Sequence, residues 1–304
     1  MFSSLSTKFS NSMQLFRQSW SVLQQDKKLL ILPAISGTLL FLLVGIGVGA
    51  LVVVIASKPE FQNSRGSSQN AAAELRESMG MLWYVAIGAI YFVTHFVMTF
   101  FQTALMACIM ERLDGRTPSL RAGLALACTR IPQLLAWSLL TATVGVVLNA
   151  LKEKAGWIGR LFLGGIEAVW NIATFFVVPV LVVEGVGPIT AVKRSATVVR
   201  RQWGEALITQ FGFSMITGLM ALVSALILIG GGTAISIATS SFVPGVVCFL
   251  LWVAFALALS LVSSVMRSIL IAATYRMAFA GDTNTGPFRP EQLQGLFARK
   301  GSKR

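Results

Sequence analysis

Six long runs of apolar residues dominate this sequence, and each is long enough to cross a lipid bilayer. A helix needs about 20 apolar residues to cross a hydrocarbon core about 30 Å thick. The six predicted spans are Leu29–Ala56, Met79–Met110, Ile131–Leu151, Leu161–Val183, Ala206–Ile229 and Val243–Met266. We therefore predict an all-α fold, a polytopic transmembrane helical bundle of six spans. The glycines at 230–232 predict a break between the last two spans.

The balance of charged and apolar residues excludes an ordinary soluble protein. Charged residues make up 12% of the chain and hydrophobic residues 55%, whereas a soluble domain carries about 25% charge. The same composition excludes a disordered chain. Cys108, Cys128 and Cys248 are isolated from one another, and the chain has one histidine. We therefore expect no metal site and no cofactor.

The Lys and Arg residues predict how the chain is oriented. A net charge of +13 would suggest nucleic-acid binding in a soluble protein, but in a membrane protein Lys and Arg concentrate in cytoplasmic loops. Nineteen of the 25 Lys and Arg residues lie on the side that holds both termini, and six lie on the other side. We therefore predict cytoplasmic N- and C-termini and no nucleic-acid partner. The N-terminus lacks a signal-peptide pattern, so we expect the first span to stay in the mature protein.

One unit, a cytoplasmic amphipathic stretch followed by a transmembrane hairpin, recurs three times. The predicted units of this single membrane domain (1–304) are 1–112, 113–187 and 188–280, followed by a basic cytoplasmic tail, 281–304. Pro33 and Pro132 mark the bends from amphipathic stretch to span in the first two units. Pro118 and Pro188 open the other amphipathic stretches, because proline suits the first helical turn.

Each amphipathic stretch carries apolar residues at helical spacing. These are Met13, Phe16, Trp20 and Leu23, then Leu120, Leu124, Ala127 and Ile131, then Ile189, Val192, Ala196, Val199 and Trp203. Such helices can lie in the membrane interface with a basic face toward anionic headgroups. The residues predicted to bind anionic lipid or a protein partner are Arg17, Trp20, Lys193, Arg194, Arg200, Arg201 and Trp203. The alternative is that these helices cap the bundle, with their apolar faces against protein.

Several segments resemble a bacterial family of uncharacterised membrane proteins, domain of unknown function 6159. The resemblance is carried by 19–27, Leu113-Asp114-Gly115, 175–188, Ala191, Lys193-Arg194-Ser195, Trp203-Gly204-Glu205 and 290–297. The chain is also loosely similar to the group that holds the membrane domains of glycerophosphodiester phosphodiesterases and Yip1-type proteins. The resemblance implies a multi-pass protein of the bacterial inner membrane, and it brings no activity or catalytic residue.

Three polar residues within the predicted spans are candidates for an intramembrane site, because ionisable groups in lipid are costly and often functional. Glu167 lies six residues after Arg160, and Asn171 follows one turn later on the same face, so the two could line a cavity. His95 lies among aromatic residues of the second span, with no titratable partner expected at its depth. The alternatives are a helix–helix hydrogen bond for Glu167 and Asn171, and a neutral, hydrogen-bonded His95.

Small residues along two spans predict close helix packing. They are Gly45 and Gly49 in the first span, and Ala256, Ser260, Ser264, Ser268 and Ala272 along the last. We predict that both ridges face other helices, within the chain or in a homo-oligomer. Arg267 and Arg276 are expected to reach the interface from the end of the last helix. Pro179 is a candidate break in the fourth span.

The sequence contains no nucleophile with a base in reach, and the loops are too short for an enzyme domain, so we do not expect an enzyme or catalytic residues. Two functions stay open. The favoured one is a non-enzymatic membrane organiser that binds anionic lipid or a protein partner through its basic amphipathic helices. The other is a transporter or channel for a small solute that uses the polar groups within the spans.

Overall fold

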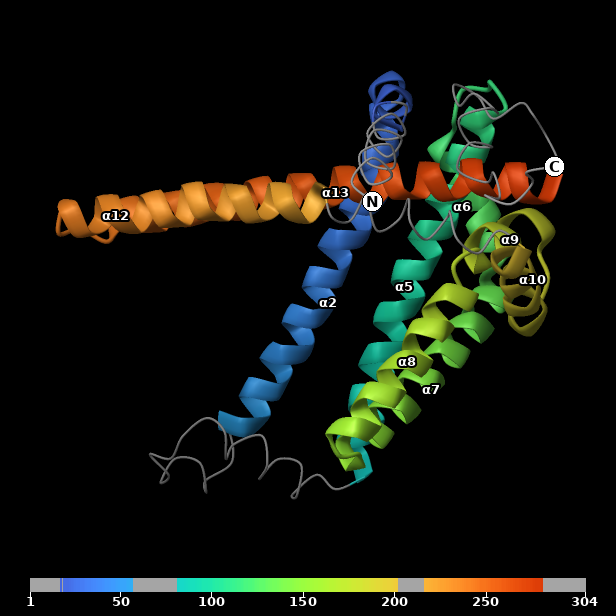
Figure 1. The fold of residues 1–304 in the computed structure, drawn as a ribbon, viewed down its shortest axis with the longest axis horizontal. Helices are drawn as coiled ribbons and strands as arrows, with labels where there is room; N and C mark the ends of the chain where they lie inside the picture. Colours follow the sequence, from blue (N-terminus) through green and yellow to red (C-terminus); the bar gives the residue numbers. More distant parts are fainter. Residues whose placement is uncertain (1–16, 18, 57–80, 202–215, 281–304) are drawn as a thin grey trace, which may run out of the picture.

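The structure is a computed structural model that describes residue 17 and residues 19–56, 81–201 and 216–280. Within these residues every regular element is a helix (Figure 1). Six helical stretches are long and apolar enough to cross a membrane: Lys27–Gly47, Gly88–Leu113, Ile131–Lys154, Trp157–Glu184, Ile216–Ala238 and Val243–Arg276. The predicted all-α fold with six candidate spans is therefore confirmed for the described residues.

Four helices run in a similar direction and form the main bundle (Figure 1). They are α2 (Ile31–Ala56), α5 (Met81–Leu113), α7 (Ile131–Lys154) and α8 (Trp157–Ala173). A short 3₁₀ helix, η1 (Lys27–Leu30), leads into α2. Pro132 is the second residue of α7, where a missing N–H costs no helical hydrogen bond, and it lies at the start of the candidate span Ile131–Lys154. Pro33 is the third residue of α2 and lies inside the candidate span Lys27–Gly47, because η1 leads directly into α2. The bends predicted at the two prolines stay predictions.

Helix α5 lies at the centre of the packing. It contacts α2, α6 (Leu120–Thr129), α7, α9 (Val177–Glu184) and α13 (Val243–Ala280). Helix α6 approaches α5 closely at Gly123. A Cβ at that position would lie 2.5 Å from Cys108 Sγ and 2.7 Å from the carbonyl oxygen of Ala104. Any side chain at position 123 would therefore push α6 away from α5.

The predicted fourth span consists of two helices. Helix α8 ends at Ala173, and α9 begins at Val177 after a turn at 174–176. The chain does not break at Pro179, because Pro179 lies in the first turn of α9, where its missing N–H replaces no helical hydrogen bond. Most of α9 is buried, so this second piece packs within the protein.

The helix of the fifth predicted span runs straight through the glycines at 230–232, so the predicted break there is wrong. Residues 216–225 are α-helical, Leu226–Gly230 are π-helical (η2), and α12 (Gly231–Ala238) follows without a gap. Gly230 has helical backbone angles, with φ −62° and ψ −46°. Glycine allows the backbone angles of a helix break, but the helix breaks at a glycine only where the surrounding structure favours a turn.

The turn between the last two spans lies at 239–242, where Ser240 has a φ of 47°. Gly232 instead packs against α13, since a Cβ there would lie 2.5 Å from Cys248 Cβ. The small residue thus brings two apolar helices together, which is how glycine contributes to helix pairs in membranes.

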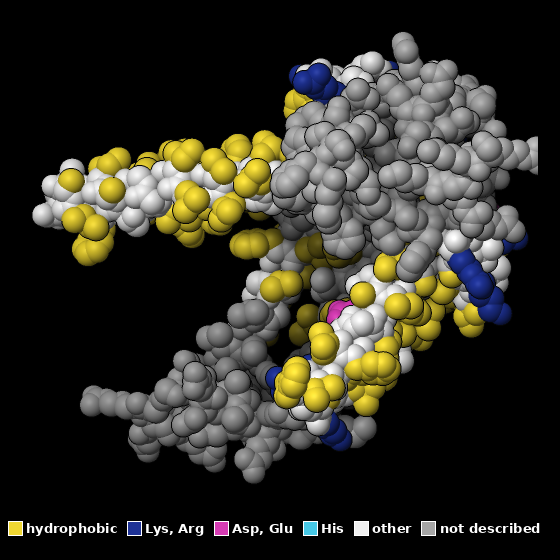
Figure 2. Space-filling view, in the orientation of Figure 1, with side chains coloured by type: hydrophobic (Ala, Val, Ile, Leu, Met, Phe, Trp, Pro, Cys, Tyr) yellow, Lys and Arg dark blue, Asp and Glu magenta, His cyan; other side chains and the backbone are white. Residues whose placement is uncertain are grey.

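Helix α13 continues beyond Met266, where the sixth span was predicted to end. It runs from Val243 to Ala280, and no glycine or proline interrupts it after Gly245. With α12, its first half projects away from the main bundle and carries exposed apolar side chains (Figures 1 and 2). Its second half is buried against α5 and α9.

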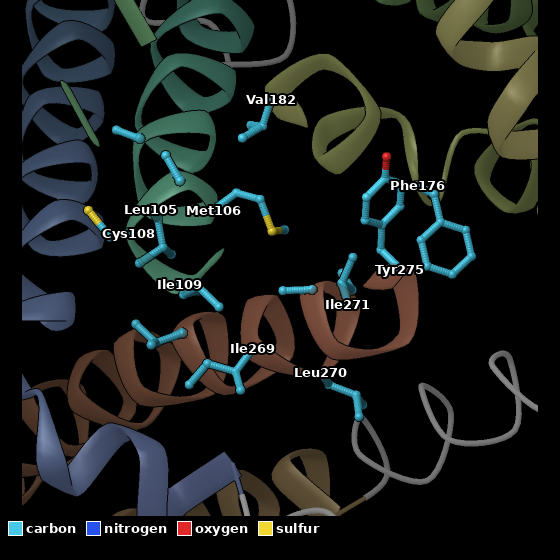
Figure 3. Close-up of a cluster of buried hydrophobic side chains, with 14 of the residues drawn as sticks. Leu105, Met106, Cys108, Ile109, Phe176, Val182, Ile269, Leu270, Ile271 and Tyr275 are labelled. Atoms are coloured by element: carbon cyan, nitrogen blue, oxygen red, sulfur yellow. The ribbon is translucent and has the colours of Figure 1, made fainter. Parts of the chain in front are cut away.

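The hydrophobic core lies where α5, α9 and the second half of α13 meet (Figure 3). Its members include Leu105, Met106, Cys108, Ile109, Val182, Ile269, Ile271 and Tyr275, with Phe176 just before α9. This core joins the first, second and third predicted units, so the three repeats do not fold as separate bodies.

The small-residue ridges face other helices only in part. On α13, Ser268 and Ala272 are buried, whereas Ser260 and Ser264 are exposed within one chain. On α2, a Cβ added at Gly45 or Gly49 would contact nothing within 4 Å. The prediction is therefore wrong for Gly45, Gly49, Ser260 and Ser264 within a single chain, and their role in an oligomer stays a prediction.

Candidate functional site

The candidate site lies at the end of the bundle where α9 turns into α10 (Pro188–Arg201). Gly185 ends α9 with a φ of 63°, a left-handed conformation that favours glycine. The guanidinium group of Arg130 lies directly against Gly185, so a side chain at position 185 would overlap it. Gln133 Nε2 donates to the Gly185 carbonyl oxygen at 3.4 Å. Arg130 thus places a positive charge at the carbonyl end of α9, which the helix dipole favours.

Helix α10 packs its small residues against the bundle. Ala191 and Ser195 are fully buried and Val199 is 8% exposed, and α10 contacts α7, α8 and α9. Ser195 Oγ accepts the backbone N–H of Phe176 at 2.9 Å. That N–H belongs to the residue before α9, so Ser195 stabilises the start of the buried helix.

This buried face differs from the predicted one. The predicted stripe was centred on Ile189, Val192, Ala196 and Val199, but Ile189 is 65% exposed, and Val192 and Ala196 are half-buried. The reason is steric, because Ala191 and Ser195 are small enough to let the helix approach the bundle. Ile189 is left facing outward, whereas Val192 lies at the edge of the contact and packs partly against the core.

The basic residues of α10 divide into two groups. Lys193 and Arg200 are exposed, and among the described residues no ion pair involves either of them. Arg194 forms an ion pair with Glu184 at the end of α9. The side chain of Arg201 and the whole of Trp203 lie outside the described residues. Figure 2 shows Lys and Arg side chains at the α10 end of the molecule, with hydrophobic side chains beside them.

The N-terminal amphipathic helix shows a similar shift of its buried face. Ser19, Val22 and Leu23 are buried, whereas Trp20 is 40% exposed and Arg17 is exposed. Met13 and Phe16, the other members of the predicted stripe, lie outside the described residues. In both helices, therefore, the amphipathic element caps the bundle on one side and leaves a bulky apolar residue outside.

Three separate groups of polar contacts, which we together call the polar collar, join the ends of several helices. Its members are Asp26, Arg112, Asp114, Glu184, Arg194, Tyr275 and Arg276. Arg112 Nε lies 2.8 Å from Asp26 Oδ2, and Arg276 Nη1 lies 2.7 Å from Asp114 Oδ1. The Tyr275 hydroxyl donates to Glu184 Oε1 at 3.3 Å. Each carboxylate of the collar has a cationic partner, so the collar holds helix ends together rather than presenting a free acid or base.

Arg276 belongs to the collar. Its side chain is 13% exposed and paired with Asp114, and its predicted reach to the membrane interface stays a prediction. Arg267 is exposed on α13. The sequence offered one signal of the collar: Asp114, Glu184 and Arg194 lie in segments that carry the family resemblance. Their partners on α13 could not be read from spacing, because they lie far away along the chain.

The three polar residues within the spans do not come together. Glu167 forms an ion pair with Lys152 across the α7–α8 hairpin, and Asn171 is exposed. His95 Nδ1 lies 3.1 Å from Thr99 Oγ1, one turn along α5. Among the described residues no hydrogen bond or ion pair joins His95 to Glu167 or Asn171. The contacts of Glu167 and His95 agree with their structural alternatives, whereas the role of Asn171 stays a prediction.

The described residues contain no cluster of three or more His, Cys, Asp or Glu side chains that could hold a metal ion. The free thiol of Cys108 is buried on α5, where its Sγ donates to the Ser119 carbonyl oxygen at 3.5 Å. The arrangement at the α10 end therefore supplies exposed cations, half-exposed apolar side chains and paired carboxylates. Such a surface can bind an anionic, amphiphilic partner.

The fold and the site together define an all-helical chain with six candidate membrane spans and a basic helix packed at one end. The chain belongs to a family of unknown function, DUF6159, whose family model matches residues 81–286. The comparison with curated proteins found no match. The looser similarity to Yip1-type proteins stays a prediction.

Proposed function

We propose that this protein is a non-enzymatic membrane organiser of the bacterial inner membrane, with both termini in the cytoplasm, that binds anionic lipid through α10. The observation that carries the proposal is the outward strip of α10, which we define as Ile189, Lys193, Ala196 and Arg200. On this strip, half-exposed or exposed apolar side chains lie beside two exposed cations. A helix with this division suits the boundary between headgroups and acyl chains.

The structure changes which cations should matter. A basic residue near an anionic membrane surface contributes about 1 kcal/mol. Among the described residues no ion pair involves Lys193 or Arg200, whereas Arg194 is already paired with Glu184. We therefore assign the lipid contact to Lys193 and Arg200, and assign Arg194 to the polar collar.

Transport of a small solute is less well supported. Glu167 is paired with Lys152, Asn171 is exposed on the side of the bundle, and His95 is bound to its own helix through Thr99. A proton or solute path needs polar groups that face one another across the spans. Structural roles explain the contacts of Glu167 and His95.

A local probe on α10 of the full-length protein tests the proposal. A fluorophore is attached at Thr197→Cys, an exposed position close to Lys193 and Arg200, after Cys128 and Cys248 are replaced by Ser. Reconstituted vesicles contain phosphatidylcholine with spin-labelled phosphatidylglycerol or spin-labelled phosphatidylcholine as quencher. We expect the anionic quencher to be preferred several-fold, and we expect raised salt to reduce the preference because it shortens the screening length.

Two double variants complete the experiment. Lys193→Gln with Arg200→Gln should remove most of the preference for the anionic quencher. Arg116→Gln with Arg121→Gln removes the same charge from two exposed positions, one in the turn after α5 and one in the first turn of α6, and should leave the preference for the anionic quencher unchanged. The proposal would be overturned if both double variants lost the preference for the anionic quencher equally. It would also be overturned if the unmodified protein showed no such preference.

A further inference from the structure

A cavity lies between the N-terminal helix and α13, apart from the outward strip of α10. Its volume is about 410 Å³, and its walls are formed by Arg17 and Trp20, by the helix of residues 216–225, and by Phe255, Ala258, Leu259 and Val262 on α13. Pockets that bind small ligands measure about 300–1,000 Å³. The cavity is therefore large enough for part of an amphiphilic molecule.

The described residues that line the cavity are apolar apart from Arg17. The α13 residues and Trp20 present hydrocarbon or aromatic surface, and Arg17 is the one ionisable group among these described lining residues. Arg17 lies one turn before Trp20 on the same face of the N-terminal helix. This combination matches a molecule with a long apolar part and an anionic end.

The position of the cavity relative to the candidate spans supports a lipid as that molecule. Its α13 wall belongs to the candidate span Val243–Arg276, and Arg17 and Trp20 lie shortly before the candidate span Lys27–Gly47. Trp and Arg residues concentrate at the ends of membrane spans, where an aromatic ring and a cation meet the headgroups. An acyl chain in the cavity would therefore lie beside the hydrocarbon layer with its headgroup near Arg17.

The charge of Arg17 favours an anion at this cavity. Arg17 is exposed, and among the described residues no ion pair involves it. The cation of the described lining is therefore available to an anionic group.

We propose that this cavity binds one acyl chain of an anionic phospholipid, with its phosphate group held by Arg17. The site extends the proposed lipid binding to a single bound lipid at a second place, and it does not depend on the outward strip of α10.

Photolabelling of the full-length protein in vesicles tests this directly. The probes are phosphatidylglycerol and phosphatidylcholine, each with a photoreactive group in the acyl chain, and the labelled residues are mapped by mass spectrometry. We expect strong labelling of 255–262 by the phosphatidylglycerol probe. Labelling spread evenly along the exposed first half of α13, without enrichment at 255–262, would overturn the proposal.

Two variants and one matched control test the contact with the lipid's acyl chain and the contact with its headgroup separately. Ala258→Trp fills the cavity and should abolish the labelling of 255–262, whereas Leu257→Trp adds the same side chain at a position that is 62% exposed and does not line the cavity. Arg17→Gln should lower the preference for phosphatidylglycerol about fivefold, the factor that corresponds to about 1 kcal/mol. Unchanged labelling in Ala258→Trp, or an unchanged preference in Arg17→Gln, would overturn the assignment.

The same probes test whether lipid binding in this cavity is independent of the lipid binding proposed for α10. Lys193→Gln with Arg200→Gln should leave the labelling of 255–262 intact, and loss of that labelling would contradict an independent site. Thermal unfolding of Ala258→Trp and Leu257→Trp shows whether both variants fold. If Ala258→Trp does not fold, the map of the unmodified protein and the Arg17→Gln preference decide the outcome.

Discussion

Arg276, near the end of α13, lies 2.7 Å from Asp114, in the turn that follows α5. The Arg276 side chain is 13% exposed and that of Asp114 is 35% exposed. The pair joins the last described helix to the central helix of the bundle. It also lies next to Tyr275, which donates to Glu184 and so continues the contact to α9. One short stretch of α13 thus connects two parts of the chain that precede it by many residues.

Loss of this pair should destabilise the folded protein. We expect Asp114→Asn or Arg276→Gln to cost about 1.5–3 kcal/mol, the range for a hydrogen bond to a charged group, measured as unfolding of the purified protein in detergent. The double variant should cost less than the sum of the two, because the same contact is lost only once. The control is Arg116→Gln: its side chain is 72% exposed, so its pair with Asp114 should contribute less than about 1 kcal/mol. Additive effects of the two collar variants would contradict the interpretation.

Gly185 should not tolerate a side chain. Gly185→Ala would place a Cβ against the Arg130 guanidinium at a residue whose φ is 63°. We expect destabilisation of more than about 1 kcal/mol, because the left-handed backbone and the steric overlap both act against alanine. Gly187→Ala is the matched control two residues later, since a Cβ there contacts nothing within 4 Å. Equal melting temperatures of the two variants in detergent would show that the close contact has no energetic role.

Removal of the Ser195 hydroxyl should weaken the start of α9. Ser195→Ala leaves the buried N–H of Phe176 without its acceptor, and an unsatisfied buried donor costs about 1–3 kcal/mol. Thr197→Ala, on the exposed side of the same helix, should have little effect. The two variants can be compared by thermal unfolding and by hydrogen exchange of 176–184. Unchanged exchange in Ser195→Ala would argue against this role.

The orientation predicted from Lys and Arg can be tested at two described loops. Thr117→Cys lies in the exposed turn between α5 and α6, and Gly156→Cys lies between α7 and α8. With Cys128 and Cys248 replaced by Ser, a membrane-impermeant thiol reagent should label Gly156→Cys in intact cells. It should label Thr117→Cys only after the membrane is permeabilised. The reverse pattern would place both termini outside.

Glu167 should behave as a structural residue. Its pair with Lys152 is half-exposed, with side-chain exposures of 47% and 27%, so Glu167→Gln should lower stability by less than about 1 kcal/mol. Neither Glu167→Gln nor His95→Ala should alter the lipid preference measured on α10. Glu153→Gln, at an exposed position of α7, serves as the control. Solute flux in reconstituted vesicles that disappears only in Glu167→Gln would favour transport over the proposed function.

The sequence alone determined the features that depend on local composition. Long apolar runs predict helices that can cross a membrane, and Pro132 lies at the start of one of them. The apolar spacing of 188–201 predicts an amphipathic helix. Each of these features depends on residues that lie within one helical turn or one span of the chain.

The tertiary structure decided which of these local possibilities is realised. The glycines at 230–232 continue a helix because α13 packs against Gly232. The buried side of α10 is set by the small residues Ala191 and Ser195, because close approach to the bundle depends on the shape of the opposing surface. Arg276 is buried in an ion pair because folding brings Asp114 beside it. Contacts between distant segments depend on how whole helices pack, and no short sequence pattern encodes that packing.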